Sequence, residues 1–239
     1  MLNVSHLSKR YSGKTVKAVD DLSFQTKEGE IFGLLGLNGA GKSTTFKCIA
    51  GILPFDEGKI EICGFDVVKD EIKAKRNFAF IPDNHAVFEG LTGREYINFM
   101  ADIYEVSESD RNERVARFCE MFEFEKYLDS QIRSYSHGMK QKIAIMGGII
   151  HYPKLWILDE PLLGLDPLSI RQVQDFMRDY VKGGNTIVFS SHILDTVDKL
   201  CDRILVIDGG VSKGVFELSE LRKEAGYDIS ELFFGLVWR

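Results

Sequence analysis

Residues 36–44 read Gly36-Leu37-Asn38-Gly39-Ala40-Gly41-Lys42-Ser43-Thr44 and match the pattern G-x-x-x-x-G-K-[ST]. The glycines permit backbone angles closed to other residues, so that successive N–H groups can turn inward on a phosphate. A strand-like stretch, Ile31 to Leu35, precedes this turn, and a helical stretch, Ser43 to Ala50, follows it. The positive end of that helix favours an anion at the same point. The segment therefore predicts a loop that binds the phosphates of ATP.

Each polar residue of the loop has an expected role. Lys42 supplies a positive charge to the β- and γ-phosphates, and the Ser43 hydroxyl is expected to ligate Mg²⁺. The nucleotide contacts expected from the loop are Asn38, Gly39, Ala40, Gly41, Lys42, Ser43 and Thr44. The other interpretation is a chance match in a glycine-rich turn, but the strand before it and the helix after it favour the phosphate loop.

Further strand-like stretches indicate the fold class. Three of them are almost continuously apolar, as is typical of parallel strands covered on both faces: Phe78 to Ile81, Leu155 to Leu158 and Thr186 to Ser190. Three others alternate more between apolar and polar residues and indicate a small antiparallel sheet: Val4 to Leu7, Ala18 to Gln25 and Lys59 to Cys63. From about Thr92 to Ile150 the pattern is helical, without a strand-like interruption.

The predicted fold class is therefore α/β. We expect a P-loop NTPase core with a mainly parallel sheet, a small antiparallel β subdomain and an inserted helical subdomain. The whole chain, 1–239, is predicted to form a single domain. Its expected parts are a catalytic core at about 1–83 and 153–216, a helical subdomain at about 84–152 and a C-terminal helical tail at about 217–239.

Composition limits the classes of function. With 44% hydrophobic and 28% charged residues, the chain resembles an ordinary soluble globular protein. No apolar run approaches the roughly 18–20 residues of a membrane span, and the N-terminus has no signal-peptide pattern. The four scattered cysteines suggest reduced thiols in a cytoplasmic protein. A net charge of -6 argues against a nucleic-acid partner, and none is expected.

Two carboxylates end the strand Leu155-Trp156-Ile157-Leu158-Asp159-Glu160. In a nucleotide hydrolase, the acid at such a strand end holds Mg²⁺, usually through water, and this role is predicted for Asp159. Glu160 is then placed to act as the general base on the attacking water. The alternative is a strand that ends in solvated acids, as many α/β proteins have. The phosphate loop favours the catalytic interpretation.

A third motif lies between these two, at Ser134-Tyr135-Ser136-His137-Gly138-Met139-Lys140-Gln141-Lys142, a polar turn that opens a helix from Met139 onward. With the later Ser190-Ser191-His192, the motifs follow the order of the ABC ATPase family, which the chain resembles from about Leu2 to Val215. The resemblance implies a head-to-tail dimer, homodimeric or heterodimeric, with two ATP molecules at its interface. Ser136 and the N–H of Gly138 would then contact the γ-phosphate of the opposite protomer.

The resemblance extends to single positions. Tyr11 matches the aromatic residue that stacks on adenine, although a core tyrosine is the alternative. His192 matches the histidine that senses the γ-phosphate, and Asp166 matches the acid of the dimer-contact loop that begins at Pro161. The family pattern L-S-G-G-Q reads Y-S-H-G-M here, so His137 departs from it and is interpreted as a solvent-facing turn residue rather than a catalytic group.

A clearer departure follows the strand Phe78 to Ile81. The family places a glutamine there that touches Mg²⁺ and relays motion to the membrane partner, whereas this chain has Asp83. A carboxylate is a hard oxygen ligand and suits Mg²⁺, but aspartate is one methylene shorter than glutamine. Asp83 is therefore a candidate metal ligand, and we expect it to act from one water away.

The resemblance also implies partners. Residues from Ala86 to Met100 resemble the segment that meets an integral membrane transporter subunit, and Thr92 with Glu95 also suggests an ordinary capping box. Gly29 to Gly36 resembles the branch that exports drugs, peptides, polysaccharides or ions. The chain is then expected to lie on the cytoplasmic face of a membrane through its partner. The apolar tail, Ile229 to Trp238, is expected to pack on its own domain, with a partner-binding or membrane-surface role as the alternative.

Rival functions remain within the same family. A soluble ATPase that acts on ribosomes, DNA ends or iron–sulfur assembly is the alternative, but the chain lacks the tandem halves and long coiled coils of such proteins. A regulatory subunit without hydrolysis would typically have lost the acid at Glu160.

Overall fold

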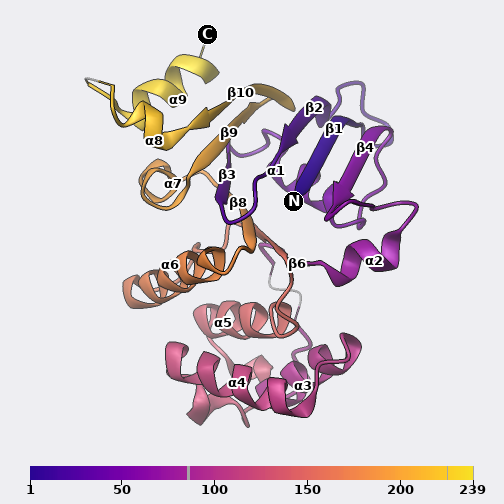
Figure 1. The fold of residues 1–239 in the computed structure, drawn as a ribbon, viewed down its shortest axis with the longest axis vertical. Coiled ribbons are helices and arrows are strands. Elements are labelled where there is room, and N and C mark those ends of the chain that lie inside the picture. The colour runs from indigo at the N-terminus through magenta and orange to yellow at the C-terminus, as the bar shows by residue number, and fades with distance from the viewer. Residues whose placement is uncertain (85–86, 225, 239) are drawn as a thin grey trace.

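The structure is a computed structural model that describes residues 1–84, 87–224 and 226–238. Figure 1 shows two sheets in one half of the molecule and a group of helices in the other half, below them in that view. The larger sheet has six strands in the order β10-β9-β3-β8-β7-β6. These strands are β3 (Ile31–Leu35), β6 (Phe78–Ile81), β7 (Leu155–Asp159), β8 (Thr186–Ser191), β9 (Arg203–Asp208) and β10 (Val211–Glu217). All neighbours pair in parallel except β9 and β10, which are antiparallel.

The four strands predicted as buried are confirmed, while β9 and β10 were overlooked. The signal for β9 was present, since Ile204 to Ile207 are continuously apolar and fully buried. Successive side chains of these strands enter opposite layers of the core. In β7, for example, Trp156 and Leu158 join the layer under the helical half, whereas Leu155 and Ile157 join the layer that faces the smaller sheet.

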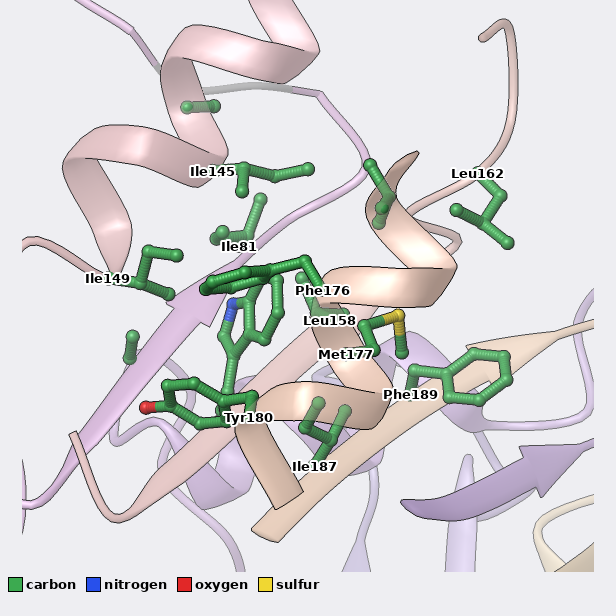
Figure 2. Close-up of a cluster of buried hydrophobic side chains, with 14 of the residues drawn as sticks. Ile81, Ile145, Ile149, Leu158, Leu162, Phe176, Met177, Tyr180, Ile187 and Phe189 are labelled. Carbon is green, nitrogen blue, oxygen red and sulfur yellow. The ribbon is translucent and has the colours of Figure 1, made fainter. Parts of the chain in front are cut away.

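Helices cover both faces of the large sheet. One face carries α1 (Lys42–Ile49), which contacts β7, and the other carries α6 (Pro167–Lys182) and α7 (Leu194–Leu200), which contact β3 and β8. Figure 2 shows Phe176, Met177 and Tyr180 of α6 beside Leu158, Ile187 and Phe189 of the strands. Burial of such large side chains provides the main stabilisation of this layer, at about 1.5–3 kcal/mol for each.

The smaller sheet is antiparallel, as predicted, and has the order β2-β1-β4-β5. Its strands are β1 (Leu2–Lys9), β2 (Val19–Gln25), β4 (Glu57–Ile62) and β5 (Phe65–Asp66). Phe24 of β2 stacks on Phe32 of β3 with ring centroids 5.5 Å apart, so that aromatic contact joins the two sheets. A short helix, α2 (Glu71–Arg76), leads from the small sheet to β6.

The helical block contains α3 (Gly93–Ile103), α4 (Glu108–Phe122) and α5 (His137–Gly148), with 3₁₀ turns at Glu125–Tyr127 and Ile132–Ser134. Between residues 87 and 150 the structure describes no strand, as the helical pattern predicted. The capping box is confirmed, because the Thr92 N–H donates to Glu95 Oε2 at 2.8 Å and the Glu95 N–H donates to Thr92 Oγ1 at 3.2 Å. The division into core, subdomain and tail at the stated boundaries stays a prediction.

The C-terminal segment packs on its own domain, as expected. It contains α8 (Leu218–Leu221) and α9 (Ile229–Val237), and α9 contacts α7 and β9. Ile229 and Phe233 of α9 are buried in the core, while Trp238 remains exposed. Within the described part of the chain, no helix combines the length and hydrophobicity that crossing a membrane requires.

Candidate functional site

The predicted site residues meet at one end of the large sheet. Because the carboxyl ends of parallel strands lie at the same edge, the segments that follow β3, β6, β7 and β8 converge there. They enclose an open cavity of about 420 Å³. Its lining residues are Tyr11, Ala18, Asn38, Gly39, Gly41, Lys42, Ser43, Thr44, Asp83, Glu160, Leu163 and His192. Ala18 and Leu163 were not among the predicted contacts.

The phosphate loop forms one wall of this cavity. Gly41, with φ 108°, is the last residue before α1, and a Cβ atom there would lie 2.5 Å from the carbonyl oxygen of Ala18. Only glycine therefore fits this position. Lys42 is 6% exposed, and its Nζ donates to the carbonyl oxygens of Gly36 at 2.8 Å and Leu37 at 3.2 Å. The ammonium group is thus held inside the loop, at the start of α1. Ala40 lies in the loop but is buried beneath the cavity surface.

Asp159 is buried at the end of β7, below the cavity. Its Oδ1 accepts a hydrogen bond of 2.6 Å from the Ser190 hydroxyl, and its Oδ2 is buried without a hydrogen-bond partner among the described residues. An unpartnered carboxylate oxygen in such a place is costly unless something else satisfies it. This orphaned oxygen and the nearby oxygen-bearing side chains suit a hard cation such as Mg²⁺.

No group of three or more His, Cys, Asp and Glu side chains in the described ranges is arranged to hold a metal by itself. In nucleotide sites, Mg²⁺ is usually held by one or two protein oxygens together with the phosphates. Ser43 and Asp159 would be those protein ligands. Asp83 is exposed and lines the cavity, and its predicted action from one water away stays a prediction.

Glu160 lines the cavity in a constrained backbone conformation. Its φ of 50° lies in the left-handed region, which side chains other than glycine rarely adopt. Its carboxylate Oε1 lies 3.0 Å from His192 Nδ1 and 3.6 Å from Lys42 Nζ. The Glu160 carboxylate therefore lies between the phosphate-loop lysine and the histidine that follows β8.

Tyr11 lies at the rim of the cavity. Its side chain is 41% exposed, and its hydroxyl lies 3.1 Å from Thr44 Oγ1 on α1. The alternative of a core tyrosine is therefore wrong. The exposed ring beside the phosphate loop is free to stack on a flat apolar group, and its role toward adenine stays a prediction.

Ser136 and Gly138 do not line the cavity. Ser136 is the N-cap of α5, and its hydroxyl accepts a 3.3 Å hydrogen bond from the Met139 N–H. The helix begins at His137, so the expected start at Met139 is wrong by two residues. His137 is exposed, as predicted, but it lies in the first turn of the helix rather than before it. Its ring packs on Gly164, and a Cβ atom added to Gly164 would lie 2.5 Å from the His137 ring.

The loop after Glu160 is held firmly in place. Gln141 of α5 is buried, and its Nε2 donates to the Pro161 carbonyl at 2.9 Å. Asp166 caps α6, and the hydrogen bonds that it accepts from Ser169 hold the pKa of its carboxyl below the ordinary value. The sequence prediction missed Gln141 as a support of this loop and Ser190 as a support of the acidic pair. Gln141 stands within the quoted motif Ser134 to Lys142, and that position was the sequence feature that could have indicated its role.

Comparisons with known proteins agree with this geometry. The family model described as ABC transporter matches residues 19–163. The chain is 36% identical to the ABC-type transporter ATP-binding protein EcsA of Bacillus subtilis, over 95% of this chain and 91% of that protein. It is 35% identical to the linearmycin resistance ATP-binding protein LnrL of the same organism, over 95% of this chain and 73% of LnrL. A solved ATP-binding subunit of an ABC transporter superposes with a TM-score of 0.92 at 35% identity and covers 99% of each chain.

The order of the motifs, the cavity at the strand ends and the match over more than half of the chain all indicate the same family. The chain belongs to the ABC transporter family, as an ATP-binding subunit that hydrolyses ATP for transport.

Proposed function

We propose that this chain powers an exporter by closing head to tail, with a second ATPase subunit, over two molecules of ATP. One observation carries this proposal. The cavity of a single chain contains Lys42, Glu160 and His192, but it lacks Ser136 and Gly138, which lie on another part of the surface. The start of α5 offers N–H groups suited to a phosphate. A second chain would bring that helix to the cavity and complete the site.

Within the closed site, each of these side chains has a proposed role in binding or hydrolysis. Lys42 binds the β- and γ-phosphates, and Tyr11 stacks on adenine. Ser43 and Asp159 would hold Mg²⁺, which would neutralise charge at the phosphates. Glu160 accepts the proton of the attacking water. His192 Nδ1 lies 3.0 Å from Glu160 Oε1 and donates a hydrogen bond to that carboxylate in the tautomer that carries the proton on Nδ1. His192 also contacts the γ-phosphate.

Export, rather than import, is supported by two observations. LnrL is described as a resistance protein, and such a protein would act by removing a toxic compound from the cell. The stretch from Gly29 to Gly36 and the pair Thr44-Thr45 of this chain resemble the export branch of the family. The partner would be an integral membrane subunit, which would keep this chain on the cytoplasmic face of the membrane.

An apolar surface that shares no residue with the lining of the cavity is the proposed contact for that membrane subunit. Phe88 and Phe99 are 53% and 43% exposed, with ring centroids 5.4 Å apart in an edge-to-face arrangement. They line an apolar depression of about 480 Å³ together with Leu91. Ala86, the first residue of the segment predicted to meet the membrane subunit, lies outside the described residues.

We expect Phe99→Asp to abolish co-purification with the integral membrane subunit, since a charge in an apolar contact is costly. Basal ATP hydrolysis by the isolated chain should stay within about two-fold, because Phe99 is remote from the chemistry. Ile72→Asp, at an exposed position on α2, is the matched control and should retain the partner. The measurement is affinity purification from detergent-solubilised native membranes, with the partner identified by mass spectrometry. Recovery of ribosomal proteins in place of an integral subunit would contradict the proposal.

The variant Asp83→Asn tests the role of the aspartate that stands where the family has a glutamine. An acid that acts through water leaves the metal largely indifferent to this change, because the direct electrostatic attraction is screened. We therefore expect the Mg²⁺ concentration at half-maximal ATP hydrolysis to change by less than about two-fold, while stimulation by the membrane subunit falls. A Mg²⁺ titration of both proteins is the measurement. A several-fold rise in the midpoint would instead make Asp83 a direct ligand.

A further inference from the structure

A single buried hydroxyl joins the two acids of the site. Ser190 of β8 is fully buried and lies directly across from Asp159 in the register of β7 and β8. Its Oγ donates to Asp159 Oδ1 at 2.6 Å and accepts the N–H of Glu160 at 3.0 Å. A serine hydroxyl has one proton to donate and lone pairs to accept, so both capacities are used on adjacent residues of the same strand end.

One of these two bonds orients the Asp159 carboxylate, and the other holds the backbone of Glu160. The bond to Oδ1 sets the rotation of the Asp159 carboxylate and leaves Oδ2 as its only oxygen without a protein partner in the described chain. The bond from the Glu160 N–H holds the backbone at the point where it turns into the left-handed region. That conformation is disfavoured for glutamate and persists only where the surroundings determine it.

The rest of the turn is supported from other directions. The Leu163 N–H donates to the Glu160 carbonyl oxygen at 3.2 Å, and Gln141 holds the next carbonyl, that of Pro161. Neither of these bonds touches a carboxylate. Ser190 also lies two residues before His192, whose ring contacts Glu160. The hydroxyl therefore ties the strand that carries the histidine to the strand that carries both acids.

We propose that Ser190 is a positioning residue for ATP hydrolysis, which aims Oδ2 of Asp159 at the metal position and holds the Glu160 carboxylate against His192. This inference rests on the proposed roles of Asp159 and Glu160. Without the hydroxyl, Asp159 rotates and the backbone of Glu160 relaxes from φ 50°. The nucleotide still binds, since the phosphate loop and Tyr11 make no hydrogen bond to Ser190 in the described structure.

The test compares Ser190→Ala and Ser190→Thr with Thr186→Val. Thr186 lies on the same strand, is equally buried, and donates its hydroxyl to the Lys27 carbonyl oxygen at 2.9 Å, far from the acids. Thr186→Val therefore removes one buried hydroxyl bond without touching the site. We expect Ser190→Ala to lower kcat by roughly 10–100-fold, as a displaced catalytic group does. Thr186→Val should leave kcat within about two-fold, and Ser190→Thr should restore most of the activity by restoring the hydroxyl.

Three further readouts separate a positioning role from general damage to the fold. Affinity for ATP in the absence of metal, followed with a fluorescent analogue, should change by less than about two-fold in Ser190→Ala. Mn²⁺ binding in the presence of a non-hydrolysable ATP analogue, followed by electron paramagnetic resonance, should weaken several-fold. The thermal midpoint should fall in both variants and further in Ser190→Ala, because that variant loses two hydrogen bonds and Thr186→Val loses one.

Normal kcat in folded Ser190→Ala, or an equal loss of kcat in Thr186→Val, would overturn the proposal. So would loss of metal-free ATP binding in Ser190→Ala. The roles of the acids are tested separately by Glu160→Gln. If Glu160→Gln retains turnover, the proposed base is wrong. If Glu160→Gln is inactive while Ser190→Ala is fully active, only the positioning role fails.

Discussion

Replacement of Glu160 by glutamine will lower the turnover of ATP by about 10²–10⁴-fold, the usual cost of losing a positioned base. The amide has the size of the carboxylate, so it still fits between His192 and Lys42, which lie 3.0 Å and 3.6 Å from Oε1. It cannot accept the proton of the attacking water. ATP binding should therefore remain near normal, and a dimer with trapped ATP should accumulate.

Steady-state phosphate release and size-exclusion chromatography with ATP measure these two outcomes. Glu57→Gln is the control, because it removes an exposed carboxylate on the small sheet that pairs with Lys17. Its turnover should equal that of the unchanged chain. Near-normal turnover in Glu160→Gln would exclude Glu160 as the base and would assign proton acceptance to another cavity residue.

Parts of the fold were predictable where one physical signal dominated. Strands β3, β6, β7 and β8 are buried on both faces, so their sequences are continuously apolar and their identification was simple. Strand β10 alternates between partly buried and exposed residues at the sheet edge, and it carries Gly214 at its centre, which weakens any strand pattern. The sequence pattern therefore did not predict β10 as a strand.

The start of α5 shows two local preferences in competition. Histidine and glycine are poor helix formers, so a helix from Met139 onward was the natural expectation at His137 and Gly138. In the structure the Ser136 hydroxyl caps the helix, and that bond brings both residues into its first turn. The cap places the N–H groups of His137 and Gly138 at the start of the helix, where the proposed dimer would use them.

The hydrogen bonds that support Asp159 and Glu160 could not be predicted from the sequence, for a different reason. The motifs identify Lys42, Asp159 and Glu160 because their chemistry is tied to short spacings. The support from Ser190 depends on the register between β7 and β8, and nothing in either strand alone encodes it. A serine near the end of an apolar strand has no distinctive pattern. Only the pairing of Asp159 with Ser190 shows what the hydroxyl does.

The second large effect concerns assembly. Lys42→Ala and Ser136→Ala should each abolish most hydrolysis alone, and an equal mixture should recover about a quarter of the wild-type activity per site. The reason is geometric, since Lys42 lines the cavity and Ser136 does not. In the head-to-tail dimer, a mixed pair has one site with an intact phosphate loop from one chain and an intact Ser136 from the other. Half of the randomly formed dimers are mixed, and each has one intact site of two.

A second mixture provides the control for this result. Lys42 and Glu160 line the same cavity, with Nζ and Oε1 3.6 Å apart, so their defects lie in the same half of a site. A mixture of Lys42→Ala with Glu160→Gln therefore leaves no intact site in any dimer, and it should recover nothing. Phosphate release is measured over a dilution series in which analytical ultracentrifugation reports the oligomeric state. Equal recovery in both mixtures, or full activity per chain where the unchanged protein is monomeric, would contradict the shared-site dimer. Recovery in the first mixture alone means that Ser136 acts on the ATP bound by its partner chain.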